Sequence, residues 1–221
     1  MNLSKSLEYF DPLNQLDAPI TIIGIGAMGS RLAELLARLG VPKIHIWDMD
    51  IVEDKNIANQ VYFHHQIGIK KTDALEEILK DINPSIKVVK HDKYTSEALS
   101  GYIFLAVDSI ETRYNIAKAN EMNTNIKAMF DTRMRLEDAQ SYGANWKDEE
   151  QKKVFIASMS FTDKEAAEAT PVSACGTTLS VASTVVSTAA FTVSNFMNLI
   201  RAGKCDAMIF TDAFKHTITK F

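Results

Sequence analysis

The sequence predicts an α/β fold with a doubly wound, mostly parallel sheet and an antiparallel extension at its C-terminal end. Short apolar runs alternate with longer segments of helical period from Ile20 to Phe130. Within this part, Tyr102–Val107 is apolar throughout, as expected of a strand that is buried on both faces. The pattern changes afterwards, where shorter strands flank a charged turn. These observations together indicate β-α-β units followed by antiparallel strands.

The predicted elements follow this pattern in order. We expect strands at Ile20–Ile23, Lys43–Trp47, Ile86–Val89, Tyr102–Val107 and Lys127–Phe130, and helices at Ala27–Leu39, Thr72–Leu79 and Glu111–Met122. The last third should contain strands at Ala139–Asn145 and Lys153–Met159, a long Ser/Thr-rich helix that ends near Gly203, and a closing hairpin of Ala207–Phe210 and Lys215–Thr219. We assign residues 1–18 to a loosely attached N-terminal arm and residues 19–221 to one domain.

Composition narrows the class of protein. The chain has 221 residues and a net charge of −4 without a run of lysine or arginine, which argues against a general nucleic-acid binder. Its two cysteines, Cys175 and Cys205, form no Cys-x-x-Cys pair, so no structural zinc is expected. The N-terminus lacks the apolar core of a signal peptide, and we expect a cytoplasmic protein.

An uncharged stretch between Gly176 and Ile200 is long enough to span a bilayer. It contains many serine, threonine and asparagine residues, which makes it too polar for a single lipid-facing span. We therefore predict a helix that is buried against the sheet, and no membrane association.

A glycine motif follows the first predicted strand. Gly24, Gly26 and Gly29 fit the pattern G-x-G-x-x-G directly before a helix, as in a Rossmann-like nucleotide fold. The first glycine permits a tight turn, the second lets a phosphate approach the backbone, and the third lets helix and strand pack closely. Asp48 ends the second strand, 19 residues after Gly29, near the spacing of a ribose-binding acid. These features suit NAD, FAD or ATP; a turn in a protein without a nucleotide is the alternative.

Further residues occur in a characteristic order. They are Asp48-Met49-Asp50, Lys55-Asn56-Ile57-Ala58-Asn59-Gln60, Gly68-Ile69-Lys70-Lys71, Asn83-Pro84, and Asp108 after the fourth strand. This order resembles the ThiF/MoeB superfamily, which includes the ubiquitin-activating enzymes. That family has G-x-G-x-x-G, D-x-D, S-N-x-x-R-Q, a lysine after a glycine, N-P, and an aspartate ending the fourth strand. The resemblance covers nearly the whole chain after the arm.

The resemblance implies a role for each matching residue. Asp48 would hold the ribose, Asn56 and Gln60 would shape the nucleotide pocket, Lys71 would contact the phosphates, and Asp108 would bind Mg²⁺. A lysine and a magnesium ion suit attack on a phosphate because they neutralise the charge that builds on its oxygens. Taken alone, Lys71 reads as a solvated lysine at a helix start, and only the resemblance favours it over Lys70. Asp108 could equally be a helix N-cap, a role that Ser109 could also fill.

The same resemblance implies an activity. An ATP-dependent adenylyltransferase would activate a carboxylate, here the C-terminal glycine of a small ubiquitin-like or sulfur-carrier protein, and would work as a homodimer. Three alternatives remain open: a tRNA-modifying dehydratase of the same superfamily, which is the one case with a nucleic-acid partner; an NAD-dependent oxidoreductase; and a degenerate, non-catalytic nucleotide-binding subunit.

Several positions depart from the family pattern. Asn59 stands where the family has arginine, and Lys55 stands where serine is usual. The N-terminal arm also lacks the Arg-Tyr-x-Arg-Gln element with which relatives reach the ATP of a partner subunit. Arg31, directly after the glycine loop, is a candidate substitute for that element from a different direction, with a surface arginine as the alternative. Cys175, expected near the start of the long helix, could form a thioester as in several relatives, or could be a buried packing residue. Cys205 reads as structural, and the pair His64-His65 reads as part of a surface loop.

Overall fold

The computed structural model describes residues 1–174 and 179–221. Its centre is an 8-stranded sheet with the strand order β3-β2-β1-β4-β5-β6-β7-β8. The strands are β1 (Ile20–Ile23), β2 (Lys43–Trp47), β3 (Lys87–His91), β4 (Gly101–Leu105), β5 (Ile126–Met134), β6 (Asp138–Asn145), β7 (Met208–Asp212) and β8 (Thr217–Lys220). Strands β1 to β5 pair in parallel, and β5 to β8 pair antiparallel. The predicted fold class, including the antiparallel extension, is confirmed.

The strand order reverses between β1 and β4. From β1 the chain moves outward through β2 to β3 and then returns to β4 on the other side of β1. The register pairs Ile23 with Trp47 on one side and with Leu105 on the other, so these three strands end level with one another. In open α/β sheets, ligands bind at the carboxyl ends of strands at such a reversal point.

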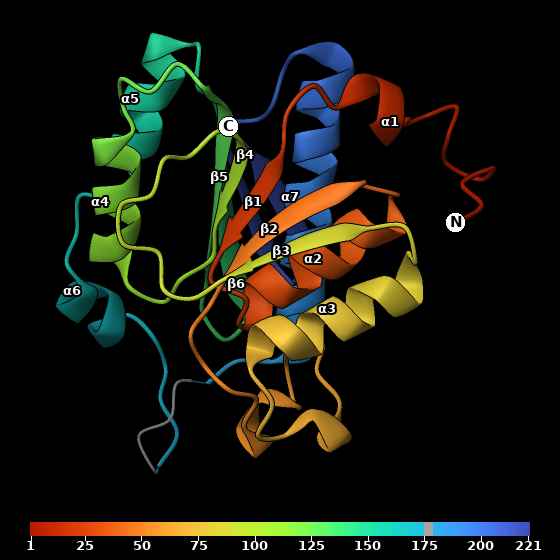
Figure 1. Cartoon of the computed structure of the whole chain (residues 1–221). Helices are drawn as coiled ribbons and strands as arrows, with labels where there is room; N and C mark the ends of the chain where they lie inside the picture. Colours follow the sequence, from red (N-terminus) through yellow and green to blue (C-terminus); the bar gives the residue numbers. More distant parts are fainter. Residues whose placement is uncertain (175–178) are drawn as a thin grey trace.

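Helices cover both faces of the sheet (Figure 1). One face carries α2 (Ala27–Arg38), α3 (Lys71–Ile82) and α7 (Ala182–Ala202); the other carries α4 (Ile110–Ala119) and α5 (Glu149–Ala157). Two separate apolar clusters fill these layers, one containing Phe104 and Phe196, the other containing Ile103 and Phe155. Shorter elements are α1 (Pro12–Gln15), α6 (Asp163–Glu168) and the 3-10 turns η1 (Asp54–Asn56) and η2 (His64–Gln66).

The strand predicted at Lys153–Met159 is wrong, because most of this segment belongs to α5, which ends at Ala157. Asp148 caps the helix by accepting hydrogen bonds from the amides of Glu150 and Gln151. Glu149 and Glu150 add negative charge to the first turn, where it interacts favourably with the helix dipole. These start signals lie in the segment that we read as a charged turn, and tertiary contacts of Phe155 bury one face of the helix.

The long polar helix packs inside the protein, as predicted. Thr192 donates from Oγ1 to the carbonyl of Thr188 at 2.9 Å, and the same Oγ1 lies within hydrogen-bond distance, 2.8 Å, of Ser141 Oγ on β6. The helix ends at Gly203, whose φ of 69° is left-handed, but it begins at Ala182, later than predicted. Over the described residues, every helix is too short or too polar to cross a membrane.

The N-terminal arm is anchored to this helix, in contrast to the loose attachment that we expected. Phe10 is completely buried, and its ring packs edge-on against Phe196 with 6.4 Å between centroids. The guanidinium of Arg201 lies 3.5 Å from the centroid of the Tyr9 ring. The arm is therefore part of the packed structure.

We predict that Phe10→Ala lowers the free energy of unfolding by about 3 kcal/mol, because it leaves a cavity beside Phe196. Leu13→Ala is the matched control in the same arm, since Leu13 is 70% exposed, and it should change stability by less than about 0.5 kcal/mol. Urea denaturation of both variants measures the difference. Equal effects would show that Phe10 contributes no more than a surface residue.

Candidate functional site

The three glycines of the loop after β1 have different surroundings. Gly24 has a φ of 86°, and a Cβ there would lie 2.8 Å from the backbone of Ala106, directly after β4. A Cβ on Gly29 would lie 1.9 Å from the carbonyl oxygen of Gly24. A Cβ on Gly26 would meet nothing within 4 Å. Gly24 and Gly29 are thus required by close packing, whereas Gly26 faces open space.

The open space at Gly26 lies at the start of α2. Gly26 is the N-cap of this helix, and no described side chain caps it. A helix N-terminus without a side-chain cap offers amide donors and the positive end of the dipole to an anion. Figure 1 shows α2 starting at the edge of the sheet where β1 and β4 end.

Two side chains hold Ile25, the residue between Gly24 and Gly26. The Tyr62 hydroxyl donates to the Ile25 carbonyl at 2.7 Å, and Asp48 Oδ2 accepts from the Ile25 amide at 2.9 Å. The other oxygen of Asp48 accepts from the Asp50 amide at 2.9 Å. Asp48 therefore joins the loops that follow β1 and β2, and each oxygen keeps lone pairs for further donors.

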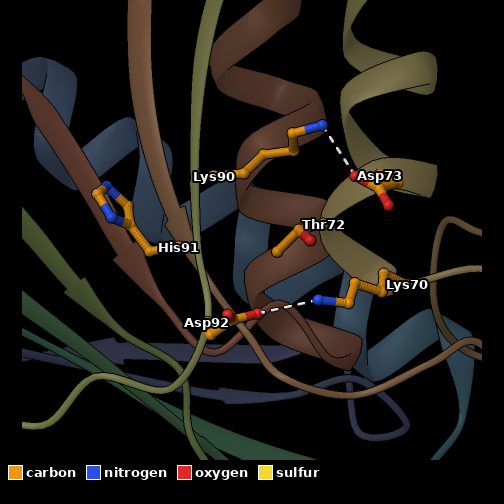
Figure 2. Close-up of a pocket in the computed structure, with 6 residues that line it drawn as sticks. All are labelled: Lys70, Thr72, Asp73, Lys90, His91 and Asp92. Atoms are coloured by element: carbon orange, nitrogen blue, oxygen red, sulfur yellow. Dashed lines mark hydrogen bonds and ion pairs between the residues drawn. The ribbon is translucent and has the colours of Figure 1, made fainter.

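Lys70 and Lys71 occupy different environments. The Lys71 side chain is 8% exposed, and its Nζ lies 2.8 Å from Asp50 Oδ2, whereas the Asp50 side chain is 57% exposed. The Lys70 side chain is 58% exposed and lies 3.3 Å from Asp92. Figure 2 shows Lys70 directed at Asp92 in a shallow pocket beside the first turn of α3. Lys71 is thus a buried ammonium held beside the Asp48 loop, where sequence alone favoured a solvated side chain.

The segment between β2 and α3 contains the remaining residues of the predicted nucleotide pocket. Asn56 Oδ1 accepts from the Glu53 amide at 2.9 Å, so this buried side chain stabilises turn η1. Asn59 donates from Nδ2 to Ser180 Oγ at 3.0 Å, which ties the segment to the residues before α7. Gln60 Oε1 is buried and finds no hydrogen-bond partner among the described residues. An unpaired buried acceptor is costly, and a ligand donor would satisfy it.

Asp108 follows β4 at the other side of the strand reversal and is exposed. Its Oδ1 accepts from the Ser109 amide at 2.9 Å. Ser109 is the N-cap of α4, because its Oγ accepts from the Thr112 amide at 3.0 Å. Of the two residues that could have capped the helix, Ser109 does so, and the Asp108 carboxylate remains open to solvent.

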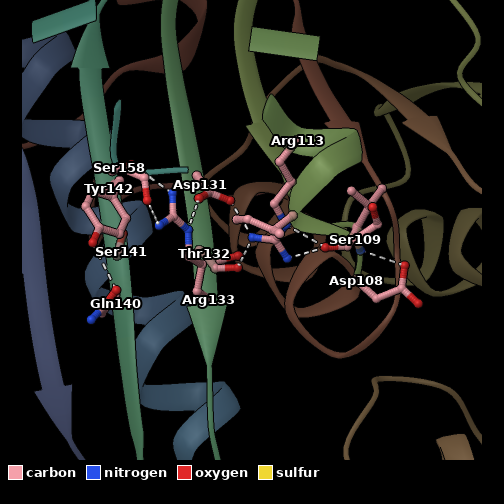
Figure 3. A network of polar contacts seen from close by, with 12 residues as sticks. Asp108, Ser109, Arg113, Asp131, Thr132, Arg133, Gln140, Ser141, Tyr142 and Ser158 are labelled. Atoms are coloured by element: carbon pink, nitrogen blue, oxygen red, sulfur yellow. Dashed lines mark hydrogen bonds and ion pairs between the residues drawn. The ribbon is translucent and has the colours of Figure 1, made fainter. Parts of the chain in front are cut away.

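A buried network that was not predicted supports the Asp108 loop (Figure 3). Asp131 on β5 is completely buried and pairs through Oδ1 with Arg113 and through Oδ2 with Arg133. Arg113 also donates from Nε to the Val107 carbonyl, directly before Asp108, at 2.7 Å. Arg133 donates to the carbonyl of Ser158 at the end of α5. The sequence signal for this network is weak, because it comes from residues far apart in the chain.

Two arginines of α2 share one carboxylate. Arg31 Nη1 contacts Glu34 Oε2, while Arg38 donates to Glu34 Oε1 from Nε at 3.0 Å and from Nη2 at 2.9 Å. The Nε of Arg31 is buried and has no hydrogen-bond partner among the described residues. Arg31 is therefore less completely paired than Arg38, although it lies nearer the glycine loop. Lys55, the other nearby cation, pairs with Glu53 at 3.0 Å.

Of the two cysteines, the structure describes only Cys205. Cys175 lies outside the described residues. Burial raises the pKa of the Cys205 thiol to about 11, so that it stays protonated and poorly nucleophilic. This agrees with a structural role for Cys205. His64 and His65 are exposed in turn η2, as expected of a surface pair.

Glycine loop, acidic residue and strand reversal together define a nucleotide-binding α/β protein of the Rossmann-like class. The model of the ThiF family matches residues 13–217, and the chain belongs to this family.

Relatives share part of the chain. Ubiquitin-like modifier-activating enzyme 5 of Branchiostoma floridae is 40% identical over 76 residues, which cover 34% of this chain and 19% of that protein. The same enzyme of Drosophila virilis is 31% identical over 145 residues, which cover 57% of this chain and 35% of that protein. The chain therefore matches well under half of the length of these relatives.

Solved structures share the fold over more of the chain. Escherichia coli MccB with ATP has a TM-score of 0.70 and 16% identity, covering 94% of this chain and 64% of that one. PaaA gives the same TM-score, identity and coverage. At this identity the likeness shows the fold.

We predict that Gly29→Ala destabilises the protein by about 3 kcal/mol, because its Cβ would overlap the Gly24 carbonyl oxygen. Gly26→Ala is the matched variant in the same loop, and it should change the free energy of unfolding by less than about 0.5 kcal/mol, since its Cβ meets only open space. Denaturant titration of both proteins compares them. A larger loss for Gly26→Ala would contradict the assignment of its open side.

Proposed function

We propose that this protein is an ATP-dependent adenylyltransferase that activates a carboxylate. A carboxylate oxygen attacks the α-phosphorus of ATP, the bond from that phosphorus to the α–β bridging oxygen breaks, and an acyl-adenylate and pyrophosphate result. The observation that carries the proposal is the convergence of the glycine loop, Asp48 and Asp108 at one strand reversal, with the buried Lys71 held at Asp50 beside them.

The residues present fit ATP. The open side of Gly26 at the α2 N-terminus gives a phosphate access to the backbone. Asp48 keeps lone pairs that can accept the ribose hydroxyls, and Gln60 Oε1 can accept a donor from the nucleotide. Lys71 has three N–H donors and gives one to Asp50, so the others can serve phosphate oxygens.

The site also fits magnesium held chiefly by the substrate. Among the described residues, no three His, Cys, Asp or Glu side chains are grouped as a metal site. A Mg²⁺ ion takes most of its ligands from phosphate and water and needs few carboxylates, so the exposed Asp108 suits it as the protein anchor. When bound, the ion would neutralise charge on the phosphate oxygens during displacement.

For the carboxylate we propose the C-terminal glycine of a small ubiquitin-like or sulfur-carrier protein, bound by a homodimer. The support is the family membership together with the names of the relatives, which are ubiquitin-like modifier-activating enzymes. MccB, which shares this fold, was solved with ATP and with MccA. Adenylation needs no thiol, and the proposal therefore does not depend on Cys175.

Other functions make different demands on the same site. An NAD-dependent oxidoreductase would use the glycine loop and Asp48 but would have no need of Lys71 and Asp108 together. A tRNA-modifying dehydratase would use all four features on a nucleoside carboxylate. A non-catalytic subunit would bind ATP without turnover, which the neutral Asn59 favours because it cannot replace an arginine fork.

We predict that the purified protein exchanges pyrophosphate into ATP in the presence of its carboxylate, and that Asp108→Ala abolishes exchange. ATP without metal should bind both proteins within about threefold, because the glycine loop and Asp48 hold the nucleotide. Isotope exchange between pyrophosphate and ATP is measured with small proteins ending in Gly-Gly and with modified tRNA as candidate carboxylates. Calorimetry measures the affinities for ATP and NAD.

Each outcome selects one function. Exchange with a Gly-Gly protein supports the proposal, and exchange with tRNA alone supports the dehydratase. Tighter binding of NAD than of Mg²⁺–ATP would overturn the adenylyltransferase in favour of an oxidoreductase. Full exchange by Asp108→Ala would remove this carboxylate from the mechanism.

We further predict that Arg31 supplies to ATP the cation that the arm, which lacks the family's Arg-Tyr-x-Arg-Gln element, does not provide. On ATP binding it would leave Glu34, which Arg38 keeps neutralised through two hydrogen bonds. Arg31→Ala should then weaken ATP binding about tenfold, as expected for loss of a charge-assisted contact. Lys80→Ala is the matched control, because it removes an exposed cation that pairs with Glu76 in the last turn of α3, away from the glycine loop, and it should leave ATP affinity unchanged. Equal ATP affinities of the two variants, measured by calorimetry, would assign Arg31 to the surface.

A further inference from the structure

Asp163, at the start of α6, reaches across to the first turn of α4. Its Oδ2 accepts from Ser109 Oγ at 2.8 Å, and its Oδ1 accepts from the amides of Ile110 at 2.6 Å and Glu111 at 3.2 Å. Its own helix has another cap, since Thr162 accepts from the Glu165 amide. The Asp163 carboxylate therefore serves α4, although 53 residues separate it from Ile110.

This contact is additional to the local cap of α4. Ser109 already satisfies the Thr112 amide through its Oγ and uses its hydroxyl hydrogen for Asp163. Asp163 satisfies two more amides of the same turn, and its negative charge interacts favourably with the positive end of the helix dipole. The first turn of α4 is consequently fixed by one residue from its own segment and one from α6.

Asp108 lies between two fixed points. On its N-terminal side, the Val107 carbonyl is held by the Arg113 guanidinium, which Asp131 orients. On its C-terminal side, Ser109 and Ile110 are held by Asp163. Because Asp163 and Ser109 occupy the amides of the helix start, the Asp108 carboxylate is not drawn into capping and stays exposed.

We propose that Asp163 is a positioning residue, which holds the α4 start so that Asp108 presents its carboxylate to the magnesium ion of bound ATP. This inference rests on the proposed function. Residues that orient a metal ligand through hydrogen bonds commonly change metal affinity by 10- to 100-fold when removed, roughly the scale expected here. Asp163 would thus act on Mg²⁺ binding through Ser109 and Ile110, without contact to the ion.

The test compares two aspartates that cap helices in the same chain. Asp163→Ala removes the contact to α4, and Asp148→Ala removes the cap of α5, where the carboxylate accepts from Glu150 and Gln151. Calorimetry measures ATP affinity over a range of Mg²⁺ concentrations for wild type and both variants. We expect Asp163→Ala to raise the Mg²⁺ concentration for half-maximal enhancement of ATP binding about tenfold. Asp148→Ala should leave it unchanged.

Controls separate positioning from general destabilisation. Melting temperature should fall by similar amounts in both variants, and ATP affinity without Mg²⁺ should stay at the wild-type value. Asp163→Asn retains an acceptor oxygen for the amides and should recover part of the Mg²⁺ dependence. If Asp163→Ala binds Mg²⁺–ATP like Asp148→Ala, or if the wild type shows no enhancement by Mg²⁺, the positioning role is overturned.

The binding assay needs no carboxylate substrate, so it is independent of pyrophosphate exchange. Wild-type exchange combined with unchanged Mg²⁺ dependence in Asp163→Ala would overturn the role of Asp163 and leave the adenylyltransferase standing. Failure of exchange with every carboxylate, combined with the expected loss in Asp163→Ala, would overturn the adenylyltransferase and support Asp163 as a positioning residue for nucleotide-bound magnesium.

Discussion

The site depends on a close approach between the backbone after β1 and the backbone after β4. Gly24 permits it, because any Cβ at that position would lie 2.8 Å from main-chain atoms of Ala106 and Val107. Main chain cannot move aside as the end of a flexible side chain can, so the constraint is steric. It brings the glycine loop and Asp108 to the same end of adjacent strands, where a triphosphate could contact both.

Around this contact, hydrogen bonds from side chains fix the backbone of both loops. Asp48 and Tyr62 fix Ile25, and Arg113 fixes Val107. Asp131 is completely buried between two guanidiniums, and loss of it would leave two charges poorly paired in the interior. Such a network limits the movement of Asp108, which suits a residue that must meet a ligand in one geometry.

Much of the site was predictable because its signals are local in sequence. The spacing of Gly24, Gly26 and Gly29 between an apolar run and a helix predicted the loop, and the structure gives each glycine the expected surroundings. Asp50, Tyr62 and Asp163 were missed as contributors. Asp50 could have been found from its spacing to Asp48. The Tyr62 hydroxyl bonds a residue 37 positions away, and the Asp163 carboxylate bonds one 53 positions away, so neither leaves a local pattern.

The sequence by itself determined the alternation of strands and helices, the doubly wound and mostly parallel class of the sheet, and the family, because periodicity and motif spacing are properties of neighbouring residues. Only the tertiary structure decided that Lys71 is buried and Lys70 exposed, that Ser109 caps α4, and that residues after Asp148 form a helix. Lys70 and Lys71 have the same side chain, so only the surrounding packing makes one exposed and the other buried. That packing comes from segments distant in the chain, which local sequence patterns do not report.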